Sequence, residues 1–297
     1  MKRSIVQQGP TTMMVSLPIK WVRKYNLSKG NELDIEESGS KLSISTENKQ
    51  LGQKAKIRLD SKDKLLIWRS LQPLYINGYD EIKIHFSDPK TLDIIQNLVI
   101  SSLIGYEITS HEKTYCIINS ISNELEKQFP KVFKKVFLDI LKMSDVFLKH
   151  FKEKEEFSTI LNLELTNNRQ TMFLKRILLR EGIEDKKNIP FMYSLMVLLE
   201  KIANEYKYLA WYLRDNKNLK ISKETIAFYE KINKELISTH NLFFSYSHEK
   251  TEEIIVKGLR VEQIKNLFKK DPEIAYSFMR ITDLTKDCLF QIMNINS

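Results

Sequence analysis

The spacing of apolar and polar residues changes along the chain. Short alternating runs fill about the first 120 residues, and runs with helical spacing fill the remainder. Near the start, the second alternating run ends at Pro18, which suits the first turn of a helix because its missing N–H is not needed there. The short helix ends before a turn at Ser28-Lys29-Gly30-Asn31, and alternation then resumes. The strands predicted in this first module are residues 2–7, 12–17, 32–36 and 41–45.

A small α/β unit is predicted over the middle of the chain. Residues 48–53 are polar and are interpreted as a linker, after which alternating and helical runs follow one another in the order β-α-β-α-β-β. Asp60 or Ser61 is expected to cap the first helix. No chemistry-bearing motif occurs in this unit, so its predicted role is to space or pair the flanking domains. The predicted elements are strands at 54–59, 81–86, 106–110 and 114–120 and helices at 61–77 and 89–104.

From about residue 122 the pattern predicts only helices, six in all. Residues 199–204 align with residues 278–283, which lie 79 positions later, so we expect two three-helix repeats packed side by side. The fold class predicted for the whole chain is therefore multidomain α+β, with domains at 1–48, 52–121 and 122–297. The helices are predicted at 124–150, 155–181, 189–214, 222–247, 252–268 and 272–294.

Charge is unevenly distributed at the start of the chain. Residues 1–31 contain no acid, and the whole chain carries a formal net charge of +9. Helix-borne Arg and Lys at one edge of a small module are typical of a nucleic-acid-binding surface, although a solvated surface would look the same. The residues predicted to contact DNA are Lys2, Arg3, Lys20, Arg23 and Lys24.

The first module is too small to bury much of its own surface. A unit of about 46 residues usually needs a disulfide, a metal or a partner. Cys116 and Cys288 are isolated in the sequence, with no spacing typical of zinc sites and no reason to expect a disulfide. We therefore expect the chain to form a homodimer.

Several classes of protein are disfavoured by the motifs that the sequence lacks. No signal peptide is recognised at the start, and the most apolar stretch, residues 191–199, is too short to span a bilayer. We therefore expect a soluble, cytoplasmic protein without membrane insertion. The sequence contains no P-loop, no G-x-G-x-x-G and no nucleophile motif, so no enzyme activity and no cofactor are expected.

Residues 15–35, VSLPIKWVRKYNLSKGNELDI, resemble the swapped-hairpin DNA-binding domain of the AbrB/SpoVT/MazE family. The resemblance implies two chains that exchange hairpins into one β-barrel, with basic residues facing DNA. Bacterial members usually place an Arg just before the second strand, where this chain has Thr11 and Thr12. The Gly9-Pro10 turn before them is closer to archaeal members. The departure argues against base contacts of the bacterial kind and leaves the expected fold unchanged.

The helical region resembles the PhoU phosphate-uptake regulators over roughly its last 175 residues. The segments that carry the likeness are LELTNNRQTMFLKRILLREG (163–182), LLEKIANEYKYLAWYL (198–213) and MRITDLTKDCLFQI (279–292). An AbrB-like head joined to a PhoU-like body is an arrangement found in archaeal phosphate-uptake regulators. The combination implies a DNA-binding transcriptional regulator. Two alternatives are an adaptor that docks on a phosphate transporter or a signalling kinase, with the head used only for dimerisation, and a metal-binding sensor.

PhoU relatives carry E/D-x-x-x-D pairs, because carboxylates four residues apart on one helix face can bind metal ions. Each pair is degenerate here, since an amide or a methionine replaces one carboxylate and removes negative charge. The favoured interpretation is that Glu164 and Glu200 lie on the bundle surface and pair with Lys or Arg, and that Asp283 and Asp287 form salt bridges with Arg280 and Lys286. The matching positions are Glu164 with Asn168, Glu200 with Asn204, and Met279 with Asp283.

Aromatic residues recur at helical spacing in two places. Trp21 and Tyr25 lie four apart on the basic helix, where they could stack on a nucleic acid but more simply seal a dimeric barrel. In the helical region a second group is interpreted as core and helix interface instead of a ligand site. This second group consists of Tyr206, Tyr208, Trp211 and Tyr212.

Overall fold

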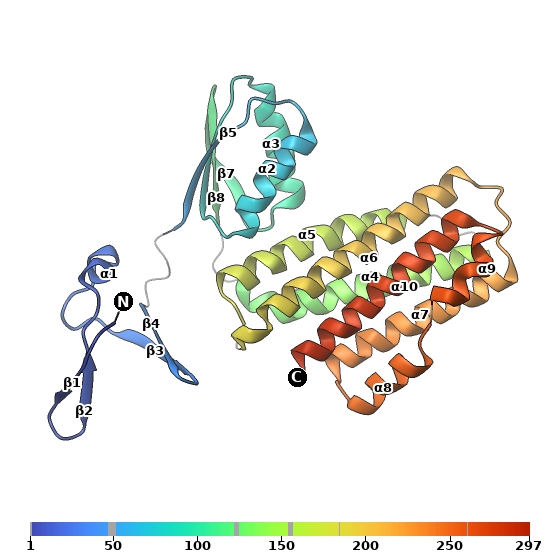
Figure 1. Cartoon of the computed structure of the whole chain (residues 1–297). Helices are drawn as coiled ribbons and strands as arrows, with labels where there is room; N and C mark the ends of the chain where they lie inside the picture. Colours follow the sequence, from blue (N-terminus) through green and yellow to red (C-terminus); the bar gives the residue numbers. More distant parts are fainter. Residues whose placement is uncertain (1, 47–51, 122–124, 154–156, 184, 260) are drawn as a thin grey trace. The chain divides into compact units, whose positions relative to one another are not determined.

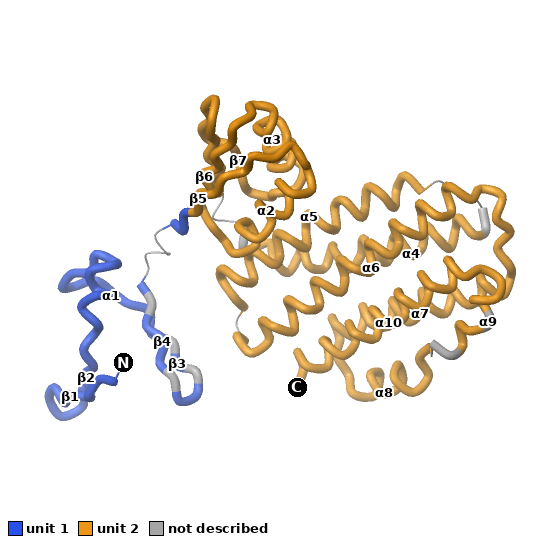
Figure 2. Tube along the Cα trace, turned by 45° about the horizontal axis from the view of Figure 1, so that its top comes forward, with its two compact units in different colours: residues 1–54 blue, residues 55–297 orange. Residues whose placement is uncertain are grey.

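The computed structural model describes residues 2–46, 52–121, 125–153, 157–183, 185–259 and 261–297. The chain is a mixed α+β protein with a helical C-terminal region (Figure 1). It divides into two compact units, residues 1–54 and residues 55–297 (Figure 2). Most of the linker predicted at residues 48–53 lies outside the described residues, as does the predicted domain boundary near residue 122. The two units are described separately below.

The first unit consists of two hairpins joined by a short helix. Each hairpin is a separate antiparallel two-stranded sheet. The predicted order of elements is confirmed, but the first strand begins at Ile5, so Lys2 and Arg3 precede the strand that they were expected to start. The elements are β1 (Ile5–Gln8), β2 (Thr12–Val15), α1 (Ile19–Lys24), β3 (Leu33–Ser38) and β4 (Lys41–Thr46).

Local sequence explains why α1 is only six residues long. Asn26 adopts the left-handed conformation at φ 51°, which ends the helix. The Leu27 N–H then donates to the Val22 carbonyl at 3.0 Å, which satisfies one of the last helical acceptors. In the turn that follows, the Ser28 N–H donates to Asn31 Oδ1 at 2.7 Å, and Gly30 supplies a φ of 91°. The turn predicted here is confirmed.

The apolar side chains of the first unit lie on its surface. Ile5 lies opposite Val15 on one face of the β1–β2 hairpin. The neighbouring pair, Val6 and Met14, points to the other face, because side chains alternate along a strand. Ile5 is 73% exposed and Val6 is 56% exposed. No side chain whose burial the structure describes between residues 2 and 46 is buried, so this unit has no core of its own.

The second unit begins with a four-stranded sheet in the order β5-β6-β8-β7, which confirms the predicted β-α-β-α-β-β arrangement. β6 and β8 are antiparallel, and their register places Ile82 opposite Ile118. Both side chains are fully buried with Ile67 and Ile95 from the two helices. The elements are β5 (Lys54–Arg58), α2 (Lys64–Ile76), β6 (Glu81–His85), α3 (Lys90–Ser102), β7 (Tyr106–Glu112) and β8 (Tyr115–Ser120).

The cap predicted for α2 is wrong. Asp63 caps this helix by accepting a hydrogen bond from the Leu66 N–H at 2.7 Å. The carboxylate of Asp60, the expected cap, instead pairs with Arg58 Nε at 2.5 Å and accepts a hydrogen bond from the Ser87 hydroxyl at 2.8 Å. These two contacts tie the end of β5 to the loop after β6. A capping residue near a helix start can be recognised in the sequence, but competition from a residue 27 positions away cannot.

The C-terminal region is a bundle around one hydrophobic core. α6 contacts α4, α5 and α10, and α7 contacts α4 and α10 (Figure 1). Among the described residues, no helix is both long enough and apolar enough to cross a membrane. The α-helices are α4 (Phe129–Glu153), α5 (Ser158–Arg180), α6 (Ile189–Asp215), α7 (Lys223–Phe244), α8 (His248–Lys257), α9 (Lys265–Phe268) and α10 (Pro272–Ile295).

The single helix predicted at 252–268 is wrong. α8 ends at Lys257, and a 3₁₀ turn and the short α9 follow. Gly258 is the reason: a Cβ there would lie 2.3 Å from the Ile254 carbonyl oxygen. The chain turns at this glycine, and the next N–H, that of Leu259, donates to Glu235 Oε2 on α7 at 3.0 Å. Buried Leu259 then joins the bundle core.

α5 is shared by both parts of the second unit. Met172 belongs to the core of the α/β part, and Leu174 belongs to the core of the bundle. On the same helix, the buried Arg176 reaches the α/β part. It donates to the Tyr75 carbonyl at 3.1 Å, and its guanidinium lies 4.7 Å from the centre of the Tyr106 ring. One turn later, Arg180 pairs with Asp80. The α/β part is therefore joined to the bundle by specific contacts in addition to the chain connection.

Candidate functional site

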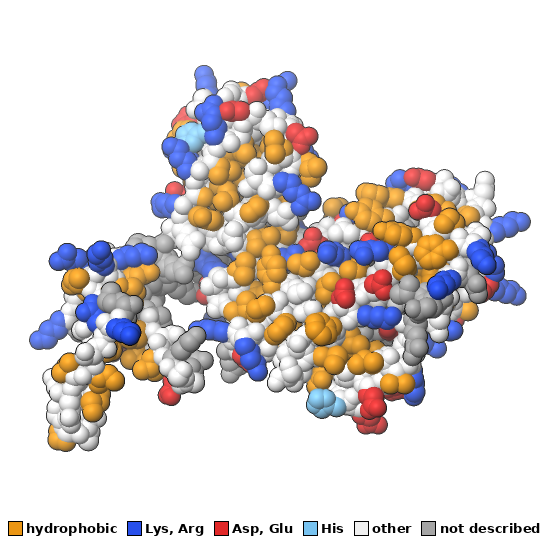
Figure 3. All heavy atoms as spheres, in the orientation of Figure 1, with side chains coloured by type: hydrophobic (Ala, Val, Ile, Leu, Met, Phe, Trp, Pro, Cys, Tyr) orange, Lys and Arg blue, Asp and Glu red, His pale blue; other side chains and the backbone are white. Residues whose placement is uncertain are grey.

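The five residues predicted to contact DNA are all exposed. Lys20, Arg23 and Lys24 lie together on α1, at i, i+3 and i+4. Lys2 and Arg3 lie in the segment before β1, and no described contact joins them to α1. Figure 3 shows Lys and Arg side chains gathered at the end of this unit that carries α1, whereas the tip of the β1–β2 hairpin carries none.

Two aromatic rings support the basic face of α1. Trp21 and Tyr25 pack against each other with ring centres 5.4 Å apart, and the Lys24 ammonium lies 5.2 Å from the centre of the Tyr25 ring. Both rings are half-buried. The cations themselves form no ion pair with any residue that the structure describes. A surface of unpaired cations on a helix can accept the phosphate groups of a nucleic-acid backbone.

Three of the residues that the sequence offered as degenerate metal-binding positions lie together in the bundle, around a residue that the sequence analysis did not single out. Lys207 on α6 places its ammonium 2.5 Å from Glu164 Oε1 on α5 and 2.9 Å from Asn204 Oδ1. Asn168 donates to the same Glu164 oxygen at 2.6 Å. We call Glu164, Asn168, Asn204 and Lys207 the α5–α6 seam. A lysine ammonium thus lies between the Glu164 carboxylate and the Asn204 side-chain oxygen.

The predicted pairing of Glu164 and Glu200 with basic residues is observed, but the surface location is wrong for Glu164. Only 2% of Glu164 is exposed. Glu200 is half-buried and pairs with the buried Lys175 at 2.5 Å. Partial burial and the neighbouring Glu200 carboxylate raise the pKa of Tyr193, which lies near the same lysine. The seam therefore contains one interhelical ion pair, Glu164 with Lys207, and Glu200 with Lys175 forms a second pair between the same two helices.

Like Glu200, Asp283 is a predicted site residue that the structure does not bring to the seam. It is half-buried on α10, and neither Asp283 nor Asp287 has an ion pair among the described residues, so the predicted salt bridges are wrong. Arg280 instead lies 3.5 Å from Glu205 on α6. Burial raises the pKa of Glu205 although Arg280 acts in the opposite direction. Within the described ranges, no three His, Cys, Asp or Glu side chains are grouped so as to hold a metal ion.

The aromatic group on α6 is divided between core and surface. Tyr206 is fully buried, but Tyr208 is 51% exposed and Trp211 is 40% exposed, so their predicted place in the core is wrong. Two residues advance a helix by about 200°, which places Tyr208 almost opposite Tyr206. The Lys207 ammonium lies 5.3 Å from the Tyr208 ring centre and 5.5 Å from that of Trp211. Lys207 therefore contacts the other seam residues and also lies next to an exposed aromatic pair, Tyr208 and Trp211.

A second cationic surface, which the sequence analysis missed, lies on the open face of the α/β sheet. Lys56 and Arg58 on β5 alternate with core-facing residues and project from this face. Lys83 on β6 lies 4.2 Å from the centre of the Tyr115 ring on β8. Burial, followed by the nearby cations Lys56, Lys83 and Arg58, lowers the pKa of His85 on the same strand. The alternation of lysine in β5 was the available sequence signal.

Comparison of the chain with protein-family models, with curated proteins and with solved structures finds no match. The functional argument therefore depends on the geometry of the chain itself. Its most informative features are the coreless first unit with unpaired cations on α1 and the lysine-filled seam between α5 and α6.

Proposed function

We propose that the chain is a DNA-binding transcriptional regulator that acts as a homodimer, with a helical body that receives a signal. The first unit would form a swapped-hairpin barrel with its partner, and the body would be a PhoU-like arrangement of two three-helix repeats. The link to phosphate uptake rests on the resemblance of the helical segments to PhoU regulators. The cytoplasm is the compartment in which such a regulator would act.

One observation carries this proposal: the first unit exposes apolar residues on both faces of a hairpin while it carries unpaired cations on α1. Burial of apolar surface is the main driving force for folding and association, so both hairpin faces require a cover. A second copy of the chain, contributing its own hairpins, would cover both faces of the β1–β2 hairpin. The exposed Lys20, Arg23 and Lys24 would then remain available for phosphate groups.

Fluorescence anisotropy of the full chain on its own promoter DNA, measured over a salt series, tests this function. If about six phosphates are contacted by the dimer, the logarithm of affinity should fall against the logarithm of salt with a slope of about −5. Arg23→Ala should cost more than Lys24→Ala if Arg23 reads guanine, since such contacts contribute about 1–3 kcal/mol. Lys24→Ala should weaken binding to all sequences alike.

The double substitution Arg23→Glu/Lys24→Glu should abolish DNA binding and leave the dimer intact. The matched control is Lys217→Glu/Lys220→Glu, which makes the same charge change at exposed positions in the second unit. If the control loses as much affinity as the α1 variant, binding reflects net charge alone. Binding that is insensitive to salt would also contradict the proposal.

The exposed aromatic pair favours a second candidate function, that of an adaptor. Tyr208 and Trp211 project from α6 with a lysine between them, and aromatic residues of this kind are enriched at protein interfaces. In this case the body would dock on a transporter or signalling protein, and the first unit would only hold two chains together. DNA binding that Arg23→Glu/Lys24→Glu does not affect would favour the adaptor over the regulator.

A further inference from the structure

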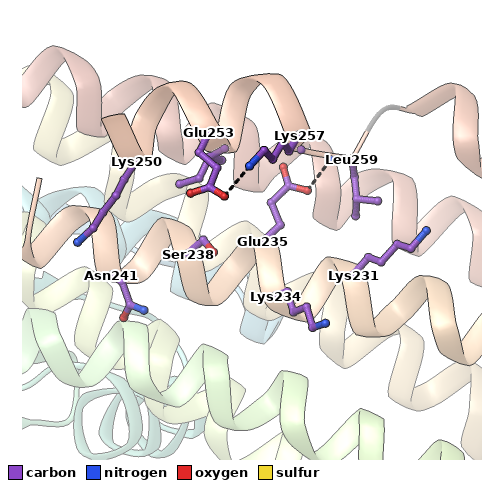
Figure 4. A pocket seen from close by; sticks show the side chains of 11 residues that line it. Lys231, Lys234, Glu235, Ser238, Asn241, Lys250, Glu253, Lys257 and Leu259 are labelled. Atoms are coloured by element: carbon purple, nitrogen blue, oxygen red, sulfur yellow. Dashed lines mark hydrogen bonds and ion pairs between the residues drawn. The ribbon is translucent and has the colours of Figure 1, made fainter. Parts of the chain in front are cut away.

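A pocket between α7 and α8 shares no lining residue with the sites described above. Its volume is about 570 Å³, within the range of about 300–1,000 Å³ that is typical of small-molecule sites. Figure 4 shows that α7 supplies one wall and α8 the other. The polar side chains on the walls include Lys231, Lys234, Ser238, Asn241, Lys250 and Lys257.

The charges of the pocket are not balanced by its own acids. Glu253 pairs with Lys257 at 3.0 Å, and Glu235 accepts the Leu259 N–H at 3.0 Å. Lys231, Lys234 and Lys250 form no ion pair with any described residue. The described lining has four lysines against two glutamates, so two positive charges remain in excess to attract an anion.

The three lysines lie at two ends of the pocket. Lys231 and Lys234 are near Leu259 at one end, and Lys250 is near Asn241 at the other, with Glu235 and Ser238 between them (Figure 4). Residues 231 and 241 are separated by ten positions of one helix, which corresponds to about 15 Å. A ligand that reaches all three cations must therefore be elongated and carry negative charge at both ends.

The side-chain types distinguish phosphate from carboxylate. The described wall contains lysine and no arginine. Arginine is the residue that matches a planar carboxylate with two parallel hydrogen bonds, whereas lysine acts as a compact point charge that suits phosphate. Between the cations, Ser238, Asn241 and Ile254 offer hydrogen bonds and apolar contact to an uncharged body.

The end of the pocket near Leu259 has no room for a side chain at Gly258. A Cβ at Gly258 would lie 3.1 Å from Glu235 Oε1 as well as too close to the helix backbone, so this position accepts no side chain in its present conformation. The glycine turn lets Glu235 hold the Leu259 N–H and keeps α8 alongside α7. The Glu235 carboxyl group is thus part of the wall, where it accepts the Leu259 N–H.

We propose that the α7–α8 pocket binds an elongated bisphosphorylated metabolite, with one phosphate at the Lys231–Lys234 end, the other at Lys250, and an uncharged body between them. This site does not depend on the DNA-binding function. The ligand class follows from the two separated cationic ends, the absence of arginine from the described wall and the volume of the pocket.

Isothermal titration calorimetry of the full chain with matched ligands tests the proposal. The probe is fructose 1,6-bisphosphate, whose two phosphates lie at opposite ends of a sugar, and its control is fructose 6-phosphate. The bisphosphate should bind more than about tenfold tighter than the monophosphate, because only the bisphosphate reaches both ends. Equal affinities, or no binding of the bisphosphate, would overturn the proposal.

Variants locate the binding within the chain. Lys231→Gln/Lys234→Gln and Lys250→Gln should each reduce the affinity for the bisphosphate to that for the monophosphate. Lys220→Gln/Lys223→Gln removes two equally exposed lysines outside the pocket and should leave binding unchanged. Arg23→Glu/Lys24→Glu should also bind the bisphosphate normally, which separates this site from the cations of α1. Equal losses in the pocket and control variants would show non-specific attraction to a basic protein.

A measurement on the unmodified protein avoids any effect of substitution on folding. Acetylation of lysines with acetic anhydride, followed by mass spectrometry, should show protection of Lys231, Lys234 and Lys250 when the bisphosphate is present. Lys220 and Lys223 should be labelled equally with and without ligand. Unchanged labelling of the three pocket lysines would contradict the site.

Discussion

Lys207 decides the character of the α5–α6 seam. Its ammonium contacts Glu164 and Asn204, two of the residues that the sequence offered as degenerate metal-binding positions. One positive charge among these oxygens compensates the one buried carboxylate, whereas a multinuclear metal site needs several carboxylates. The amides at Asn168 and Asn204 are consistent with this arrangement, because an additional carboxylate would leave unbalanced negative charge in the bundle.

Lys207→Met should destabilise the protein by about 3–5 kcal/mol, because Glu164 would remain buried without its cation. Lys207→Met/Glu164→Met should recover most of this loss, since replacing both members of a buried pair by apolar residues is often nearly neutral. Urea unfolding at neutral pH measures both. Lys201→Met, at an exposed position of the same helix, is the control. A single variant as stable as the double variant would show that the pair is not electrostatically coupled.

Glu235 should make stability depend on pH in a direction opposite to that of most carboxylates. Burial raises the pKa of Glu235. Its folded-state stabilisation is therefore fully present below the unfolded pKa of about 4.3 and is lost as pH rises through the higher folded value. Glu235→Gln cannot ionise and still offers an oxygen to the Leu259 N–H. Relative to the original protein, this variant should gain stability as pH rises from about 4 to 8.

The matching measurement is the urea midpoint of both proteins across that pH range. A stability difference that stays constant with pH would show that the Glu235 carboxyl titrates alike in the folded and unfolded chains. Glu253→Gln serves as a control, because this glutamate is exposed and its ion pair with Lys257 lies on the surface.

At the scale of single residues, the sequence identified some members of the α5–α6 seam but not Lys207, which joins them. Glu164, Asn168 and Asn204 could be selected because their segments resemble PhoU regulators, but nothing in that resemblance predicts that Lys207 contacts Glu164 and Asn204. Which face of α6 meets α5 is set by packing of the whole bundle. The same limit explains the wrong location of Tyr208 and Trp211, whose helical spacing did not show which side of α6 faces solvent.

Among the elements, α5 is the helix whose C-terminal half packs against two hydrophobic cores, that of the α/β part and that of the bundle. The contact depends on Asp80, which pairs with Arg180 and lies 3.8 Å from Arg176 Nη2. Both guanidinium groups are largely buried, and Asp80 is the carboxylate that they share, although Arg180 also pairs with Glu181 at 3.1 Å.

Asp80→Ala should therefore loosen the α/β part from the bundle and cost about 3 kcal/mol, because it leaves the buried Arg176 without its carboxylate and weakens the pairing of Arg180. Hydrogen exchange should increase in β6 and β8 more than in α6 and α10. Asp93→Ala removes an exposed carboxylate from α3 and is the control. Uniform changes across both parts would show that Asp80 affects overall stability instead of the joint.

Element prediction succeeded where local chemistry decides the outcome. The strands of the first unit and the turn at Ser28 depend on alternation and on a glycine with positive φ, both visible in the sequence. The helix predicted through 252–268 failed because a lone glycine inside a helical pattern is usually tolerated. At Gly258 a Cβ would lie 2.3 Å from the Ile254 carbonyl oxygen, and the turn there is held by Glu235, which accepts the Leu259 N–H from another helix 24 residues earlier.

At the scale of the whole molecule, the exposed hairpins predict an obligate dimer. Residues 1–48 produced alone should sediment as a dimer. In the full chain, Leu42→Glu should disrupt association of the first unit, because Leu42 is 68% exposed in one chain and would be covered in a pair. Gln7→Glu, a polar exposed position of β1, is the control.

A folded monomer of residues 1–48 at micromolar concentration would contradict the hairpin-exchange proposal. Near-ultraviolet circular dichroism and sedimentation velocity together distinguish that outcome from an unfolded monomer. The size of the first unit predicted the need for a partner, and the structure adds the apolar residues on both faces of β1–β2.

The shared helix α5 also constrains how this chain can change over generations. Each residue from Met172 to Leu178 is buried, some against the α/β core and others against the bundle. An ordinary amphipathic helix has a solvent face on which substitutions accumulate freely, but this stretch has none. In lineages descended from this gene, residues 172–178 should therefore be among the slowest to diverge.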